Sequence, residues 1–194
     1  MHGDEEELRR RGERWRLRQR AERWRRAPRT RPAEIPRPGA GQESVWDYPR
    51  PPRVEPVAQC VRVLLGDLCL ADTVRALRVV ETASPACYYV PPDSVLTSLL
   101  DPGPETTLCE WKGLAHYWSA RIGPRRVPDV AWSYPEPFEE YEALAGYFAF
   151  FPGRVDACYV GDERVTPQPG NYYGGWITRD VVGPFKGEPG SEGW

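Results

Sequence analysis

The sequence VRVLLGDLCLAD, residues 61–72, decides the fold class of this chain. Apolar residues recur at alternate positions on both sides of the pair Gly66-Asp67. A period of two is typical of a half-buried strand, and a glycine-containing pair between two such runs is typical of a tight hairpin turn. We therefore expect two antiparallel strands that meet at Gly66-Asp67.

Short strands separated by turns are expected along most of the remaining chain. The 22 prolines and 18 glycines make up more than a fifth of the 194 residues, which disfavours long helices. Asp93 is positioned to cap a short helix over residues 94–100, and a second short helix is expected over residues 138–146. The pattern predicts a mainly β protein with one compact antiparallel domain. The further expected strands cover residues 74–82, 86–90, 106–111, 115–122, 131–135, 147–151 and 155–160.

The N-terminal segment differs in composition from the rest of the chain. Residues 4–26 mix Arg, Glu, Leu and Trp, which permits a solvated helix but offers too few apolar residues for a firmly docked face. Four prolines interrupt residues 27–41. We interpret residues 1–42 as a basic, disordered arm and linker. Residues 43–194 are expected to form the β domain, including a C-terminal loop rich in glycine and aromatic residues.

The formal net charge of −2 hides an uneven distribution. Residues 1–41 hold thirteen Arg and seven acidic residues, whereas residues 42–194 hold thirteen Lys and Arg and twenty-one acidic residues. The acidic body argues against nucleic-acid binding by the folded domain. The basic arm carries Trp15 and Trp24 and could contact nucleic acid or another polyanion; the alternative is a plain solvated extension.

Cysteine spacing and hydropathy indicate the cell compartment of the protein. The five cysteines include no C-x-x-C pair, which is typical of reduced thiols in the cytoplasm. The N-terminus lacks an apolar signal sequence, and no stretch approaches the roughly 18 apolar residues of a membrane span. We expect a cytoplasmic protein with no membrane segment. No metal site is expected, because the scattered Cys and His residues lack the spacing of zinc ligands.

Lysine usage is the most informative chemical feature of the sequence. The chain has 24 Arg but only two Lys, and both lysines lie between an aromatic residue and a glycine. A position that keeps Lys can require a compact ammonium, or an amine whose pKa shifts on burial. Lys112 and Lys186 are therefore candidates to bind or react with a ligand, and the alternative is two turn residues without a role.

Four further side chains are candidates for polar chemistry. His116 and Tyr117 follow the turn at Lys112, where strand alternation places them on opposite faces, and the imidazole suits acid–base work. Arg78 could clamp a carboxylate or phosphate, or form a structural ion pair. Asp156 has apolar neighbours on both sides, so we expect a buried, paired carboxylate that supports either a site or the fold.

The aromatic residues exceed what a small core requires. Part of this surplus could line a pocket and offer Tyr hydroxyls and Trp N–H groups to a ligand, although packing in the core accounts for most of it. The aromatic candidates for ligand contact are Trp111, Trp132, Tyr134 and Trp176.

Six segments carry a family resemblance: SVWDYPRPP (44–52), RALRVVETASPACYYVPPDSV (75–95), CEWKGLAHYW (109–118), VAWSYPEP (130–137), YFAFFPGRVDACYV (147–160) and YYGGWITRDVVGPFKG (172–187). They resemble a bacterial family of domains of unknown function, numbered 427, over about residues 43–194. The resemblance implies a tent-like β fold of the Mss4 type. It also brings a nucleotidyltransferase label that the family has carried.

The sequence departs from the broader relatives that this fold implies. Zinc-binding Mss4-type proteins have two C-x-x-C knuckles, which are missing here. Methionine sulfoxide reductase chemistry needs a reactive cysteine, for which only Cys158 in a strand-like segment suggests itself. Nucleotidyl transfer needs carboxylates that hold Mg²⁺, yet the chain has neither an Asp-x-Asp motif nor a Gly-x-x-x-x-Gly-Lys phosphate loop.

Together these features predict a small-molecule-binding or catalytic β domain with an aromatic-lined pocket near Lys112. Lys112 would bind an anionic group or act as an amine, Tyr117 would orient the ligand, and Asp156 is the third catalytic candidate. Two alternatives stay open: a non-enzymatic interaction module that recruits its partner through the basic arm, and a nucleotidyltransferase by family label. The ligand and any cofactor are not identified by the sequence.

Overall fold

A computed structural model describes the backbone of residues 2–194 and the side chains of residue 9 and residues 11–194. The chain forms a mainly β domain, as expected, with two antiparallel sheets and two short strand pairs. The seven-stranded sheet has the order β2 (Arg53–Pro56), β5 (Leu77–Glu81), β6 (Ser84–Val90), β10 (Phe148–Phe150), β9 (Arg125–Ser133), β8 (Gly113–Ile122) and β7 (Leu100–Cys109). The four-stranded sheet has the order β12 (Glu163–Arg164), β11 (Ala157–Val160), β3 (Val61–Leu65) and β4 (Leu68–Thr73).

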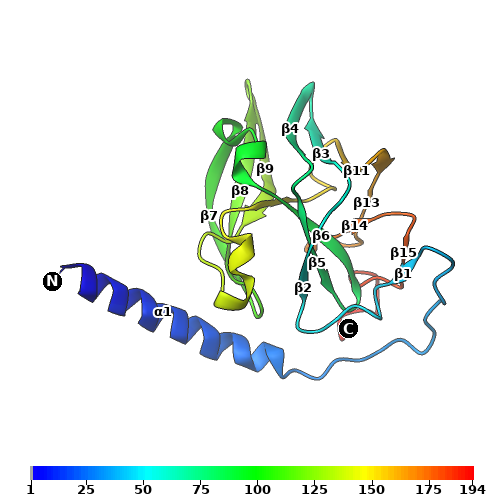
Figure 1. The fold of residues 1–194 in the computed structure, drawn as a ribbon, viewed down its shortest axis with the longest axis horizontal. Coiled ribbons are helices and arrows are strands. Elements are labelled where there is room, and N and C mark those ends of the chain that lie inside the picture. Colours follow the sequence, from blue (N-terminus) through cyan, green and yellow to red (C-terminus); the bar gives the residue numbers. More distant parts are fainter. Residues whose placement is uncertain (1) are drawn as a thin grey trace.

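The hairpin expected at residues 61–72 is confirmed. Strands β3 and β4 pair antiparallel around the Gly66-Asp67 turn, where Gly66 has a φ of 62°. This left-handed conformation is costly for residues with a Cβ atom, which explains the glycine. In Figure 1 the hairpin stands beside the upper ends of β8 and β9.

The prediction of a helix after Asp93 is wrong. Two 3₁₀ turns, η1 (Pro92–Ser94) and η2 (Thr97–Leu99), replace it, and neither has a side-chain cap. The Asp93 carboxylate instead accepts a hydrogen bond from Arg75 at 2.6 Å, so it does not cap a helix. The helix expected over residues 138–146 is a shorter 3₁₀ helix, η3 (Glu139–Leu144).

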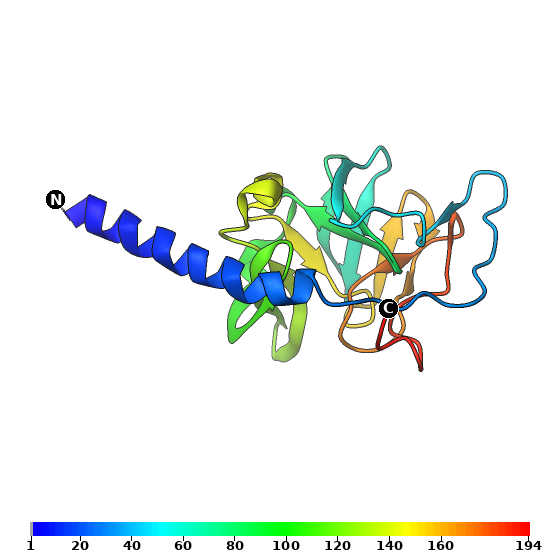
Figure 2. The same cartoon turned by 90° about the horizontal axis from the view of Figure 1, so that it is seen from below.

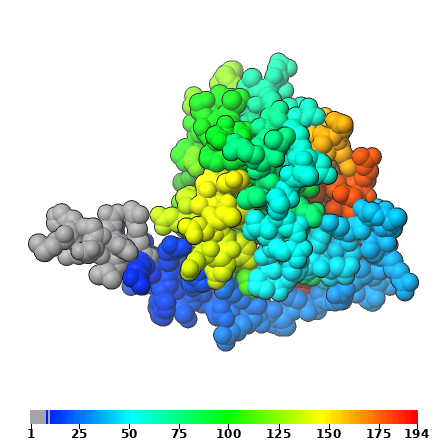
Figure 3. Space-filling view, in the orientation of Figure 1, coloured from blue at the N-terminus to red at the C-terminus, as the bar shows by residue number. Residues whose placement is uncertain are grey.

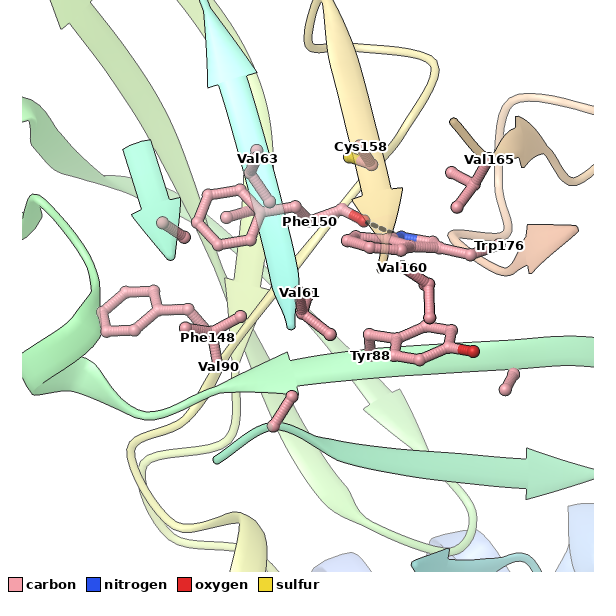
Figure 4. Packing of buried hydrophobic residues seen from close by; sticks show 14 of the residues in the cluster. Val61, Val63, Tyr88, Val90, Phe148, Phe150, Cys158, Val160, Val165 and Trp176 are labelled. Atoms are coloured by element: carbon pink, nitrogen blue, oxygen red, sulfur yellow. Dashed lines mark hydrogen bonds between the residues drawn. The ribbon is translucent and has the colours of Figure 1, made fainter. Parts of the chain in front are cut away.

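Most of the core lies between the two sheets. Strand alternation directs Tyr88 and Val90 of β6, together with Phe148 and Phe150 of β10, toward the four-stranded sheet. Figure 4 shows them packed against β3 and β11 side chains, with the Trp176 Nε1–H donating to the Phe150 carbonyl at 3.0 Å. A second hydrophobic cluster, which contains Tyr89, Trp132 and Phe151, covers the opposite face of the seven-stranded sheet.

The C-terminal segment wraps the domain as ordered chain with little regular structure, as expected. Its strands are β13 (Thr166–Pro167), β14 (Trp176–Ile177) and β15 (Val181–Val182). Strand β15 pairs in parallel with β1 (Glu43–Ser44), and β13 pairs with β14. The Trp46 Nε1–H donates to the Pro184 carbonyl at 2.9 Å, which fastens this segment to the start of the domain.

Helix α1 (His2–Arg25) precedes the domain and extends beyond it in two perpendicular views (Figures 1 and 2). Residues 27–41 follow it without strand or helix and run along the lower edge of the domain (Figure 3). The last turns of α1 contact the domain mainly through arginines: Arg18 pairs with Glu140 at 2.8 Å, and Arg25 Nε donates to the Glu110 carbonyl at 2.6 Å. The composition of residues 4–26 permits a solvated helix or a disordered arm, and in the structure this segment is helical.

Candidate functional site

A cavity of about 610 Å³ opens on the face of the seven-stranded sheet that faces away from the main core. Such a volume suits a small organic ligand. Side chains from β5 to β9 form its floor and walls, whereas α1, the residues that follow it and the C-terminal segment form its mouth. The chief lining residues are Arg20, Trp24, Arg29, Arg50, Val79, Glu81, Cys87, Tyr89, Cys109, Glu110, Lys112, Tyr117, Trp132, Tyr134, Phe151, Gln168, Tyr173, Gly174, Lys186 and Glu192.

Lys112 lies in the turn between β7 and β8, and the fold holds its backbone firmly. Its carbonyl accepts a hydrogen bond from the Phe138 N–H at 3.0 Å. Gly113 has a φ of 100°, and a Cβ there would lie 3.4 Å from the Phe138 nitrogen. The glycine thus allows the turn to close against the segment before η3, and this contact directs Lys112 inward.

The Lys112 side chain is largely buried, and its ammonium is open to the cavity. The residue is 8% exposed, and its Nζ lies 5.8 Å from the centroid of the Tyr134 ring. Among the residues whose side chains are described, none forms a hydrogen bond or ion pair with this Nζ. Burial opposes the charge, but Cys109, Tyr89 and Glu81 favour it, and the balance holds the pKa of Lys112 above its usual value. At neutral pH the carboxylate of Glu81 favours the ammonium form of Lys112.

Aromatic side chains form the wall beside this cation. The Trp132 and Phe151 rings lie 4.5 Å apart, and the Trp132 Nε1–H donates to the Tyr89 hydroxyl at 3.4 Å. Tyr117 stacks on Phe151 with 6.3 Å between the ring centroids, and the Tyr117 hydroxyl is 2.7 Å from the Thr107 hydroxyl. These contacts fix the ring positions, so the wall is preformed.

Ion pairs at the mouth neutralise its acidic side chains. Arg50 donates to Glu81 at 3.2 Å and to Glu110 at 3.0 Å, and Arg29 donates to Glu110 at 3.3 Å. The Trp111 Nε1–H also donates to Glu81 at 3.2 Å. Because five basic and three acidic side chains line the cavity, positive charge remains in excess there.

Lys186 reaches the same cavity from the C-terminal segment, but its environment differs. Its Nζ donates to the main-chain oxygen of Trp194 at 2.7 Å and lies 5.4 Å from the Tyr173 ring centroid. Burial, together with the nearby charge of Arg29, lowers its pKa below the usual value. The two ammonium groups thus differ: Lys186 Nζ has a hydrogen bond, and Lys112 Nζ has none with the described side chains.

The structure brings together half of the candidate residues named from the sequence. These residues all line the cavity, although they come from separate strands and from the C-terminal segment. The candidates found there are Lys112, Tyr117, Trp132, Tyr134 and Lys186. Trp111 is packed in the same aromatic cluster but does not line the cavity.

The other candidates lie elsewhere. His116 lies between Ala115 and Tyr117 on β8, and alternation turns it away from the cavity face that these neighbours share. Arg78 donates to Glu43 at 3.0 Å and to Glu55 at 2.8 Å, away from the cavity.

Trp176 belongs to the main core rather than to the cavity wall. Asp156, expected to be buried, is exposed. The two neighbouring residues point inward from the start of β11, so Asp156 points out, and its carboxylate accepts the Gly66 N–H at 2.5 Å. Cys158 is buried in the main core, away from the lining residues.

Several lining residues were missed in the sequence, and some could have been found. Cys87 and Tyr89 lie two apart on β6, so alternation places both on the face opposite Tyr88. Cys109 sits one residue before the turn that carries Lys112 and pairs with Gly113. Gln168 and Gly174 come from a segment without periodicity, and no sequence signal indicates that they reach the cavity.

Two findings bear on other kinds of site. No helix among the described residues combines the length and apolar character needed to cross a membrane. Within the same part of the chain, no three His, Cys, Asp or Glu side chains are grouped so that they could hold a metal ion.

Comparison with known proteins places the chain in a family. No curated protein matches it. A family model described as "Domain of unknown function (DUF427)" matches residues 53–161. The match includes Lys112, Tyr117, Trp132 and Tyr134, whereas Lys186 lies beyond it. The model covers more than half of the sequence, in agreement with the resemblance in its motifs, and the chain therefore belongs to the DUF427 family.

Proposed function

We propose that this domain binds a small anionic molecule in the cavity and that Lys112 holds the anionic group. The observation that carries this proposal is the Lys112 ammonium, which lines the cavity and has no hydrogen bond or ion pair among the described side chains. Taking a charge out of water is costly unless another group compensates for it. A carboxylate or phosphate would supply that compensation by forming a charge-assisted hydrogen bond with Nζ.

The walls indicate what the rest of the ligand looks like. Trp132 and Phe151 offer flat apolar surface, and Tyr117 offers a hydroxyl that would orient a polar substituent. Flat or unsaturated molecules with one anionic group match this combination best. Lys186 at the mouth would contact a second polar group of a longer ligand.

A thermal-shift screen of the full chain tests the proposal with pairs of anions and neutral isosteres, for example benzoate and benzamide. A ligand at about 100 times its Kd stabilises the fold by roughly 2.7 kcal/mol, which raises Tm by a few degrees. We expect shifts only with the anions. Lys112→Met abolishes them, and Lys112→Arg weakens them because the larger guanidinium does not fit the same space.

Arg125→Gln is the matched control, because it removes one positive charge from the exposed first residue of β9. It leaves the shifts unchanged. Equal shifts with neutral and anionic members, or full retention by Lys112→Met, would contradict the proposal. Nucleoside triphosphates with and without Mg²⁺ belong in the same screen, since they test the nucleotidyltransferase alternative.

A second candidate function rests on α1. Arg16, Arg20 and Arg23 repeat at helical spacing and are exposed, and Trp24, four residues after Arg20 and so on the same side of the helix, is 59% exposed. This face suits a polyanion such as single-stranded nucleic acid, with the Trp24 indole stacking on a base. Binding that weakens steeply with salt and disappears in a chain lacking residues 1–41 would support it. Salt-independent binding would count against it.

A further inference from the structure

The cavity contains a thiol next to the proposed anion site. Cys109 is the last residue of β7 and pairs with Gly113, so Cys109 and Lys112 are separated by only two residues of one tight turn. Both side chains line the cavity. A ligand whose anionic group meets Lys112 would therefore place its next atoms near the Cys109 sulfur.

The other four thiols are restrained in ways that Cys109 is not. Cys60 Sγ donates to the Asp72 carboxylate at 3.0 Å, and this bond raises the pKa of the thiol. Cys69 Sγ donates to the Ala71 carbonyl at 3.3 Å, and burial raises its pKa. Among the described residues, Cys109 Sγ has no hydrogen-bond partner.

The two remaining thiols lie within strands, Cys87 on β6 and Cys158 on β11. Burial raises the pKa of Cys87, on the cavity floor, to about 12, and burial also raises the pKa of Cys158 in the main core. A thiol reacts as its thiolate, so neither group is an effective nucleophile at neutral pH. Cys109 differs from both in position: it ends β7 beside the turn that carries Lys112, whereas Cys87 lies within β6 and Cys158 within β11.

We propose that Cys109 is a reactive thiol of the cavity and that the cavity's ligands include anionic electrophiles, namely small aldehyde acids or keto acids. This inference rests on the proposed anion site at Lys112. The carboxylate would pair with the Lys112 ammonium and present the carbonyl carbon to Cys109. The sulfur then forms a C–S bond while the C=O π bond opens, and the oxygen takes up one proton for the one the thiol loses. The adduct is a thiohemiacetal, and the step needs no oxidant or reductant.

Paired alkylating agents test the arrangement in the full chain. In both iodoacetate and iodoacetamide, the sulfur displaces iodide from a CH₂ carbon, but only iodoacetate is an anion. Peptide mass spectrometry gives the labelling rate of each cysteine with each agent. We expect the iodoacetate-to-iodoacetamide rate ratio at Cys109 to exceed the ratio at exposed Cys69 about tenfold, the low end of what electrostatic attraction produces.

Two variants and one competitor sharpen the result. Lys112→Met reduces the ratio at Cys109 to that at Cys69, and Arg125→Gln leaves it unchanged. Preincubation with glyoxylate slows iodoacetamide labelling of Cys109 but not of Cys69. In Cys109→Ser, glyoxylate still raises Tm through the Lys112 contact, but the increase is smaller.

The failures of the two proposals are distinguishable. A Cys109 that labels no faster than Cys158, in a protein that still shows anion-dependent thermal shifts, overturns the thiol inference and leaves the anion site standing. Equal ratios at Cys109 and Cys69, unaffected by Lys112→Met, overturn it as well. If the anions also give no thermal shift, the proposed function fails with it.

Discussion

The indole ring of Trp132 occupies the space in which residue 174 would carry a Cβ atom, and Gly174 leaves that space free. A Cβ added there would overlap the outer ring atoms of Trp132 and lie 3.1 Å from Cδ1 of Phe151. The C-terminal segment can therefore cross the cavity wall only with glycine at this position.

Gly174→Ala is expected to lower the free energy of unfolding by about 1–3 kcal/mol, the usual range for overpacking. It also displaces Trp132 and so weakens anion binding. Chemical denaturation and indole fluorescence measure the two effects. Gly12→Ala is the matched control, because no atom lies within 4 Å of the added methyl group and alanine favours a helix. Wild-type stability in Gly174→Ala would show that the wall is looser than the structure indicates.

Arg78 makes domain stability dependent on acid. Its hydrogen bond is the main reason that the pKa of Glu43 is lowered. For Glu55, burial acts in the opposite direction, but hydrogen bonds from Arg53 and Arg78 still lower the pKa. A lowered carboxyl pKa in the folded state contributes stability above the unfolded value, about 4.3, which is lost as pH falls through the folded value.

Arg78→Met should therefore cost about 1 kcal/mol at pH 7, because both pairs are partly exposed, and should flatten the decline in stability below pH 5. Urea denaturation between pH 3 and pH 7 gives the curve. Arg121→Met removes a single exposed pair with Asp101 and should change the curve less. An unchanged acid slope in Arg78→Met would contradict this assignment.

Arg50 connects the two carboxylates at the mouth of the cavity and lies 5.2 Å from the Trp111 ring centroid. Without it, Glu81 would lose its ion pair and Glu110 would keep only the pair with Arg29, so more negative charge would face an incoming anion. We expect Arg50→Met to weaken anion binding about fivefold, since a partly exposed charge interaction is worth up to about 1 kcal/mol. Isothermal titration at low and high salt provides the measurement. Arg125→Met removes the same charge far from the mouth and should bind normally; equal losses in both variants would indicate only a change in net charge.

Helix α1 is attached by polar and cation–π contacts rather than by an apolar face. The Arg25 guanidinium lies 5.1 Å from the Trp111 ring and donates to the Glu110 carbonyl. Arg25→Ala should accelerate hydrogen exchange in the last turns of α1 by roughly tenfold, whereas exposed Arg23→Ala should not. Exchange unaffected by Arg25→Ala would mean that other contacts hold the helix.

The hairpin of β3 and β4 could be predicted from the sequence, but only some of the residues that line the cavity could. Alternation around Gly66-Asp67 predicted β3 and β4, and the compositional contrast between Arg and Lys indicated the two lysines that the structure brings to one cavity. Alternation also places His116 and Tyr117 on opposite faces of the strand, so the sequence shows that only one of them can line a cavity on a given face.

The remainder depended on contacts between distant residues, which local patterns do not encode. Asp93 has the properties of a helix cap, but Arg75, which is 18 residues away, takes its carboxylate. Apolar neighbours suggested a buried Asp156, although at the start of a strand such neighbours point inward and leave the acid outside. Lys186 lies in an aperiodic segment, and only the complete wrapping of the chain places it near Lys112.

The seven-stranded sheet separates two tasks by face. Tyr88 and Val90 lie against the second sheet, whereas Cys87 and Tyr89 lie on the face that carries the cavity. The rate at which the two sets of positions tolerate change should therefore differ sharply. A library that varies only the cavity-lining positions of β6, β8 and β9 is expected to keep more folded members than one that varies the face packed against the second sheet.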